Sequence, residues 1–207
     1  CPMAEQKTLY EDYWLPMERV LGNLSFDAFL HDWMVVTLKK PVTKGRAMYA
    51  EFKRFAADSS LLRMERVRNL LENMLEYAKY YAAIKGVVAA GSGDMNVDQR
   101  LDLIQKLDST VTDPLVMYMF AIWRHHRISN DGLLRMLADL ESYLFRRMIC
   151  SVSSNGLNKL VPSLIAKLES AEHDLDETFA ALLLTETAKA TRMPTDEQFR
   201  QALLGED

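Results

Sequence analysis

The chain has 207 residues, of which 49% are hydrophobic and 26% are charged, and its net charge is −4. This composition is typical of a folded globular protein and excludes an intrinsically disordered chain. The length suits one domain or two small ones, whose core needs neither disulfides nor a metal ion for stability. The acidic balance excludes long-range attraction to nucleic acid, so any DNA contact requires a local basic patch.

The cysteine usage and the apolar runs indicate a cytoplasmic protein that does not associate with a membrane. The two cysteines, Cys1 and Cys150, do not suggest a structural disulfide. The longest apolar run, Leu115 to Trp123, is too short for a membrane-spanning helix, which needs about 20 residues. Because the chain opens on Cys1-Pro2 and ends after Gly205-Glu206-Asp207, we expect it to be a piece of a longer protein.

The residue pattern predicts an all-α fold, a multi-helix orthogonal bundle of about nine helices. Glycine and proline are few, good helix formers dominate, and no long stretch alternates as a strand would. In chain order, the apolar spacing predicts helices over 9–21, 26–36, 43–55, 61–84, 97–107, 113–126, 129–150, 155–168, 175–187 and a short last helix from 196.

Capping residues and prolines predict where several of these helices begin. Pro16 interrupts the first pattern, so a helix is expected to start near it. Pro162 is expected either to kink its helix or to mark a second start. N-terminal capping residues are predicted at Ser25, Thr43, Asp113 and Thr195, the last in a capping box with Gln198, and Ser129 is predicted to begin the helix that follows it.

The chain is expected to divide into two helical subdomains, 1–88 and 97–207, joined by a flexible loop at 89–96, unless the two halves form one continuous domain. The helix at 113–126 is apolar on nearly all sides and should be central. The aromatic residues of the first 33 positions are expected to form the N-terminal core, with a partner-binding groove as the alternative. They are Tyr10, Tyr13, Trp14, Phe26, Phe29 and Trp33.

The stretch around Glu141 concentrates more polar groups beside large apolar residues than any other part of the sequence. On a helical wheel, Glu141 falls inside the apolar arc of 133–148, so we expect a desolvated carboxylate with a partner from another helix or from the turn at 155–159. Arg146 faces the polar side of the wheel, and Arg147 lies at the other edge of the apolar arc.

Two interpretations of this stretch stay open. In the functional one, a polar cluster at a helix N-terminus could hold a phosphate or contact DNA. Its residues are Glu141, Arg146, Arg147, Asn155, Asn158 and Lys159. In the structural one, Asn155 is an N-cap, Glu141 is a buried structural acid, and the arginines form ordinary surface or interface pairs.

No catalytic residue, cofactor or metal site is predicted. His125 and His126 are adjacent, so they point about 100° apart on a helix and do not form the i, i+4 pair of a helical zinc site. Neither a glycine-rich phosphate loop nor a Gly-x-Ser-x-Gly elbow occurs in the sequence. We therefore do not expect this chain to be an enzyme by itself.

Six segments, in order along almost the whole chain, resemble the helical region of bacterial modification-dependent restriction endonucleases of the GmrSD class. The most specific are 141–150 (ESYLFRRMIC) and 155–159 (NGLNK). The others are 10–16 (YEDYWLP), 26–32 (FDAFLHD), 49–53 (YAEFK) and 194–199 (PTDEQF).

The resemblance implies a role in a larger anti-phage protein. In that family the helical region lies between a nucleotide-hydrolysing module with a ParB-like fold and an HNH nuclease module. Neither the Asp-Gly-Gln-Gln-Arg motif of the first nor the His…Asn…His set of the second is present here. The implied function is a non-catalytic scaffold that couples these flanking modules of the same polypeptide, with DNA as a partner of the parent protein. The alternative is a free-standing helical interaction module that binds protein or DNA as a regulator.

Overall fold

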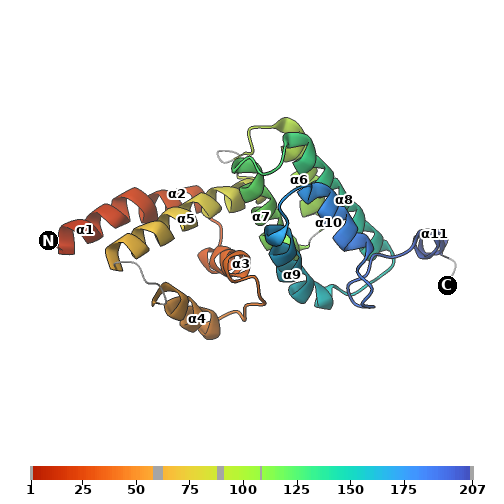
Figure 1. The fold of residues 1–207 in the computed structure, drawn as a ribbon, viewed down its shortest axis with the longest axis horizontal. Coiled ribbons are helices and arrows are strands. Elements are labelled where there is room, and N and C mark those ends of the chain that lie inside the picture. Colours follow the sequence, from red (N-terminus) through yellow and green to blue (C-terminus); the bar gives the residue numbers. More distant parts are fainter. Residues whose placement is uncertain (1, 58–62, 88–90, 108, 206–207) are drawn as a thin grey trace.

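The computed structural model describes residues 2–57, 63–87, 91–107 and 109–205, and all its regular elements are helical (Figure 1). The predicted all-α fold is therefore confirmed. The α-helices are α1 (Pro2–Leu9), α2 (Leu15–Leu21), α3 (Phe26–Leu38), α4 (Arg46–Ala57), α5 (Arg63–Ile84), α6 (Met95–Lys106), α7 (Asp113–Arg124), α8 (Asn130–Ile149), α9 (Leu157–Ser170), α10 (Leu175–Leu184) and α11 (Asp196–Leu204). Short 3₁₀ turns, η3 (Thr110–Thr112) and η4 (Ser154–Gly156), precede α7 and α9.

The α-helix α2 begins at Leu15 with Pro16 in its first turn, as predicted, but the chain before it is already helical. A π-helical turn, η1 (Tyr10–Trp14), joins α1 to α2, and the Leu15 N–H donates to the Tyr10 carbonyl five residues back. Proline has no N–H to donate, and one widened turn lets the helix accommodate that loss without ending. With α1, η1 and α2 as one helix, the described chain has ten helices where about nine were predicted.

Side-chain caps set three helix starts, two of which, at Ser25 and Thr195, were predicted as caps. Ser25, Ser129 and Thr195 precede α3, α8 and α11, and each side-chain oxygen accepts a hydrogen bond from a backbone N–H three residues on, at 3.3, 3.0 and 3.2 Å. The Thr195 N–H in turn donates to the Gln198 side-chain oxygen at 3.1 Å, which completes the predicted capping box.

Other predicted starts are wrong. Thr43 does not cap α4, which begins at Arg46. Asp94 caps α6 by accepting from the Asn96 N–H at 2.8 Å, so the helix includes the last two residues of the predicted loop at 89–96. Of the two outcomes predicted for Pro162, a second helix start does not occur, since Pro162 lies inside an unbroken α9, and a kink stays a prediction.

α7 is the central helix, as its composition predicted. Every residue from Asp113 to Ile122 is buried, and α7 packs against α3, α5, α8 and α9. One hydrophobic core extends from α2 to α10 through both halves of the chain. The division at 89–96 stays a prediction. Residues 88–90 lie outside the described residues. Within the rest of this segment, Ser92 is buried and donates its N–H to Asp98 at 2.9 Å.

The aromatic residues of the N-terminal half are mainly core, as expected. Phe29 and Trp33 are fully buried, and the Trp33 indole N–H donates to Asn73 of α5 at 2.9 Å. The Trp14 and Phe26 rings contact each other in a tilted arrangement with centroids 5.1 Å apart, and Phe26 contacts Phe29 edge-on at 6.0 Å. Tyr10, by contrast, is 49% exposed. Among the described helices, none is both long and apolar enough to cross a membrane.

Candidate functional site

Glu141 pairs with an arginine that the sequence analysis did not consider. It forms a salt bridge with Arg100, which lies on α6, the helix packed along α8. The expectation of a partner from another helix is confirmed. The expectation of a desolvated carboxylate is wrong, because the Glu141 side chain is 26% exposed. The edge of the α6–α8 contact leaves it in reach of water, which a wheel of α8 alone does not reveal.

Arg147 is the buried charge of this region, with 3% of its surface exposed. Its guanidinium donates to three backbone carbonyl oxygens, of Ser153 at 2.6 Å, Ala190 at 2.9 Å and Arg192 at 3.3 Å. It also lies over the Tyr143 ring, 5.2 Å from the centroid. No carboxylate of the described residues forms an ion pair with it. Arg147 therefore joins the turn after α8 to the loop before α11.

Two neighbours hold the same loop in place. Tyr143, one helical turn before Arg147, donates its hydroxyl to the Thr191 carbonyl. Gly156 leaves the space in which the loop lies, because a Cβ at this position would come within 2.7 Å of the Thr191 methyl group and 3.0 Å of the Ala190 oxygen. The loop at 188–192 is thus inserted between the end of α8 and η4 and held there by buried groups.

Arg146 connects α8 to α11 instead of joining the predicted cluster. It pairs with Asp196 at 2.6 Å and lies over the Phe199 ring, 5.0 Å from the centroid. Phe145 contacts the same ring edge-on at 5.9 Å. These contacts place the last described helix across the C-terminal end of α8.

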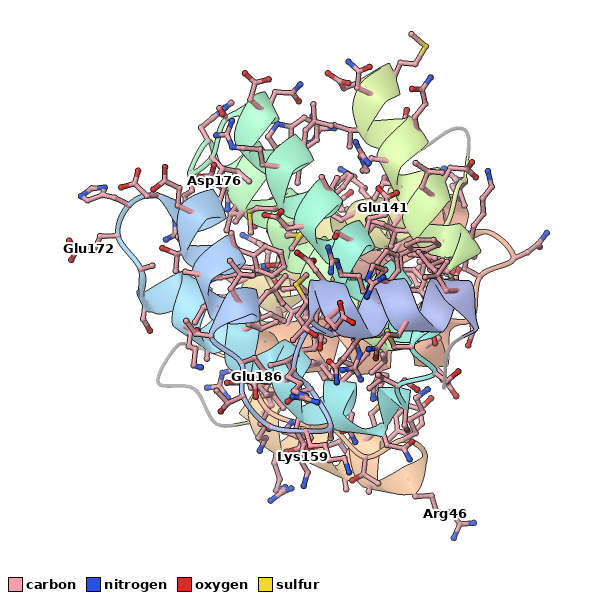
Figure 2. The ribbon with its side chains drawn as sticks, turned by 90° about the vertical axis from the view of Figure 1, so that its right-hand side faces the viewer. Arg46, Glu141, Lys159, Glu172, Asp176 and Glu186 are labelled. Atoms are coloured by element: carbon pink, nitrogen blue, oxygen red, sulfur yellow. The ribbon has the colours of Figure 1, made fainter. Side chains whose placement is uncertain are left out.

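The remaining predicted residues, Asn155, Asn158 and Lys159, are exposed. Asn155 is not the N-cap of α9, because Ser153 accepts from the Asn155 N–H at 3.2 Å and a 3₁₀ turn precedes the helix. Figure 2 shows Lys159 and Glu141 on opposite sides of α11, well apart. The structure therefore distributes the six residues among several separate contacts, and a DNA-contact role for Arg146, Arg147 and Lys159 stays a prediction.

A cleft of about 870 Å³ lies beside the Arg147 contacts. We call it the C-terminal cleft. One wall is the end of α8 and the turn after it, 149–153, and the other is formed by the loop at 189–194 and by α11. Ser153, Ala190 and Arg192, whose carbonyls Arg147 binds, all line it. Its charged lining residues are Lys189 and Arg192.

A second group of buried charges lies where α3, α5 and α7 meet. Lys85, the residue directly after α5, forms a salt bridge with Asp113 of α7, and the Asp113 side chain is only 4% exposed. Burial raises the pKa of Asp113 to about 6, although the Lys85 ammonium opposes that shift. Asp113 was predicted as a capping acid. The structure instead puts Thr112 at the N-cap position and directs the Asp113 carboxylate to Lys85.

The His31–Asp32 pair belongs to the same region. His31 Nδ1 lies 2.8 Å from an Asp32 carboxylate oxygen, and Nε2 lies 3.1 Å from the Val42 carbonyl oxygen. A carbonyl only accepts, so Nε2 carries a hydrogen, and the Nδ1–carboxylate bond needs one further proton held by either partner. Burial raises the pKa of the Asp32 carboxyl. The hydrogen bond with His31 is the largest effect that opposes this rise. With both ring nitrogens engaged, this pair fastens the loop at 39–45 to α3 and has no free nitrogen for base catalysis.

Sequence reasoning missed these buried charges, although one signal was present. Asp32 interrupts the apolar run Phe29–Val36, and Asp113 directly precedes the all-apolar run of α7. An acid inside or beside a fully buried helix must be paired or protonated, so both positions indicated a polar contact in the core.

The chain matches no protein-family model, and neither a curated protein nor a solved structure is significantly similar to it. Among the described residues, no three His, Cys, Asp or Glu side chains are grouped as metal ligands would be.

Proposed function

We propose that this chain is a non-catalytic helical scaffold of a bacterial anti-phage, restriction-endonuclease-like protein in the cytoplasm. It positions a nucleotide-hydrolysing module relative to an HNH nuclease module and couples the two. The proposal rests on the ordered resemblance of the six segments, above all ESYLFRRMIC at 141–150. We assign the chemistry to the flanking modules, because their motifs are not in this sequence.

The placement of the first and last helices is the structural observation that supports the proposal. α1 and α11 lie at opposite ends of the long axis, with the bundle between them (Figure 1). The core that connects them is continuous from α2 to α10. Modules joined to the two ends would therefore be held apart at a set distance, because a packed core deforms little.

The contact of α11 with α8 gives this role a structural basis. Arg146 and Phe145 of α8 hold α11 through Asp196 and Phe199. A module that follows α11 would take its orientation from these few side chains. Coupling between the two modules requires a structural element, such as the α8–α11 contact, whose arrangement responds to the state of each module.

The first test is the open reading frame around this chain. We expect an Asp-Gly-Gln-Gln-Arg motif upstream and a His…Asn…His nuclease set downstream. If both are missing, the scaffold proposal is rejected. A free-standing interaction module then becomes the better function, and the C-terminal cleft is the observation that favours it.

The second test uses the full-length protein with an Arg146→Ala and Phe199→Ala double variant, which loosens α11. We expect nucleotide hydrolysis to be retained and DNA cleavage in the presence of nucleotide to fall severalfold. Arg200→Ala is the matched control, since Arg200 lies on the same helix but, among the described residues, pairs only with Glu197. Unchanged cleavage by the double variant would contradict coupling through this contact.

A further inference from the structure

We infer that the C-terminal cleft binds a phosphate-bearing ligand, either a nucleotide or the sugar–phosphate backbone of a nucleic acid. The inference does not rest on the proposed function, because the cleft lies within this chain. Its volume of about 870 Å³ is within the range of small-molecule sites, roughly 300–1,000 Å³.

The charge of the cleft differs from that of the whole molecule. The chain carries a net charge of −4, yet the cleft is lined by Lys189 and Arg192 and by no aspartate or glutamate. Both cations are exposed, and neither side chain forms an ion pair with any described residue. Two cationic residues that line one concave surface without an ion-pair partner attract an anion, and a concave wall strengthens that field.

The cleft is also pre-shaped. Arg147 donates to the carbonyls of Ala190 and Arg192 in one wall and of Ser153 in the other. Tyr143 holds Thr191 between them. Because buried groups fix the backbone on both sides, the cations are presented from a rigid frame, and little ordering is needed on binding.

The lining selects phosphate over other parts of a nucleotide. Arginine and lysine are the side chains that bind phosphate, by a fork of N–H groups and by a point charge. No aromatic side chain lines the cleft, so it offers no platform on which a base could stack. Contacts with phosphate carry no sequence information, so binding should be indifferent to base identity.

The test measures binding of a fluorescent 12-nucleotide single strand to the chain by anisotropy at low salt, with unlabelled ATP as competitor. We expect Lys189→Glu with Arg192→Glu to weaken binding at least tenfold. Removing two phosphate contacts should also lower the slope of log K against log salt by about 1.4. Competition by ATP identifies a nucleotide site, and its absence identifies a nucleic-acid backbone site.

The matched control is Lys167→Glu with Arg54→Glu, which changes the net charge equally at two exposed cations outside the cleft. We expect less than a twofold effect from it. Equal losses in the two double variants would show binding to the general surface and overturn the inference. So would a failure of the unchanged chain to bind either probe at low salt.

Alkylation of Cys150 gives an independent readout. Cys150 is one of the residues that line the cleft, and it is partly exposed. In a Cys1→Ser background it is the single thiol, and a saturating ligand should slow its alkylation severalfold. An unchanged alkylation rate at saturation would place the ligand elsewhere and overturn the inference.

Discussion

The junction of α8 with α9 and the junction of α3, α5 and α7 both bury charge, but they stabilise it differently. Arg147 is surrounded by backbone carbonyls and has no counter-ion among the described residues. Asp113 and Asp32 are each paired with a cationic or protonatable side chain, and burial still raises their pKa values.

The difference lies in what each charge holds. Arg147 organises a loop whose carbonyls have no helical partners, so its removal leaves several acceptors unsatisfied. Asp113 binds one neighbouring side chain, and the cost of burying its carboxylate is only partly offset by Lys85. We therefore expect the first charge to be essential for local structure and the second to be replaceable.

The largest effect should come from Arg147→Met. The substitution keeps apolar contacts with Tyr143 but leaves three carbonyls without a donor. We expect it to lower the free energy of unfolding by about 2–4 kcal/mol, measured by urea denaturation. Proteolysis should also cut the loop at 188–192 faster. Arg135→Met, at an exposed arginine of the same helix, is the control and should change stability by less than about 1 kcal/mol.

Gly156→Ala tests the space that the loop occupies. The added methyl group would lie 2.7 Å from the Thr191 side chain and 3.0 Å from the Ala190 oxygen, so the loop must move. We expect a loss of about 1–3 kcal/mol by overpacking, seen as a lower urea midpoint. Gly132→Ala is a fair comparison, since its nearest neighbour would be 3.4 Å away. Equal effects of the two substitutions would rule out a tight loop contact.

Asp113→Asn tests the second region through pH. In the folded protein the pKa of Asp113 is raised to about 6 from 3.8, so the folded state holds the proton more tightly than the unfolded state. Its contribution is therefore fully present below about pH 4 and is lost as the pH rises to about 6.

The wild-type chain should lose on the order of 1–2 kcal/mol of stability relative to Asp113→Asn between pH 4 and pH 6.5. Urea denaturation at both pH values measures this difference. If Asp113→Asn instead destabilises the protein strongly at pH 7, then the salt bridge with Lys85 outweighs the burial of the carboxylate.

Glu141→Gln should have the smallest effect. Its salt bridge with Arg100 lies at a partly exposed helix edge, where such pairs contribute roughly 0–1 kcal/mol. We expect a change in the urea midpoint close to the error of the measurement. A loss as large as that of Arg147→Met would mean that Glu141 is more deeply buried than the structure shows.

Local patterns in the sequence determined the helices and several of their ends. Apolar spacing predicted the all-α fold and the central place of α7, and short-range rules predicted the caps at Ser25 and Thr195. These features depend on groups within a few residues of each other, such as a hydroxyl and the N–H three positions on. The same local view also identified 141–150 as a stretch rich in polar contacts.

Tertiary structure alone decided which partners those polar groups take. Glu141 pairs 41 residues away, and Arg147 reaches carbonyls 43 and 45 residues away as well as one that lies six residues on. Lys85 and Asp113 are separated by 28 residues. Such contacts depend on how whole helices pack against each other. A helical wheel of one segment carries no information about that packing. The wheel therefore placed Glu141 among apolar neighbours, whereas packing buried Arg147 and left Glu141 at the edge.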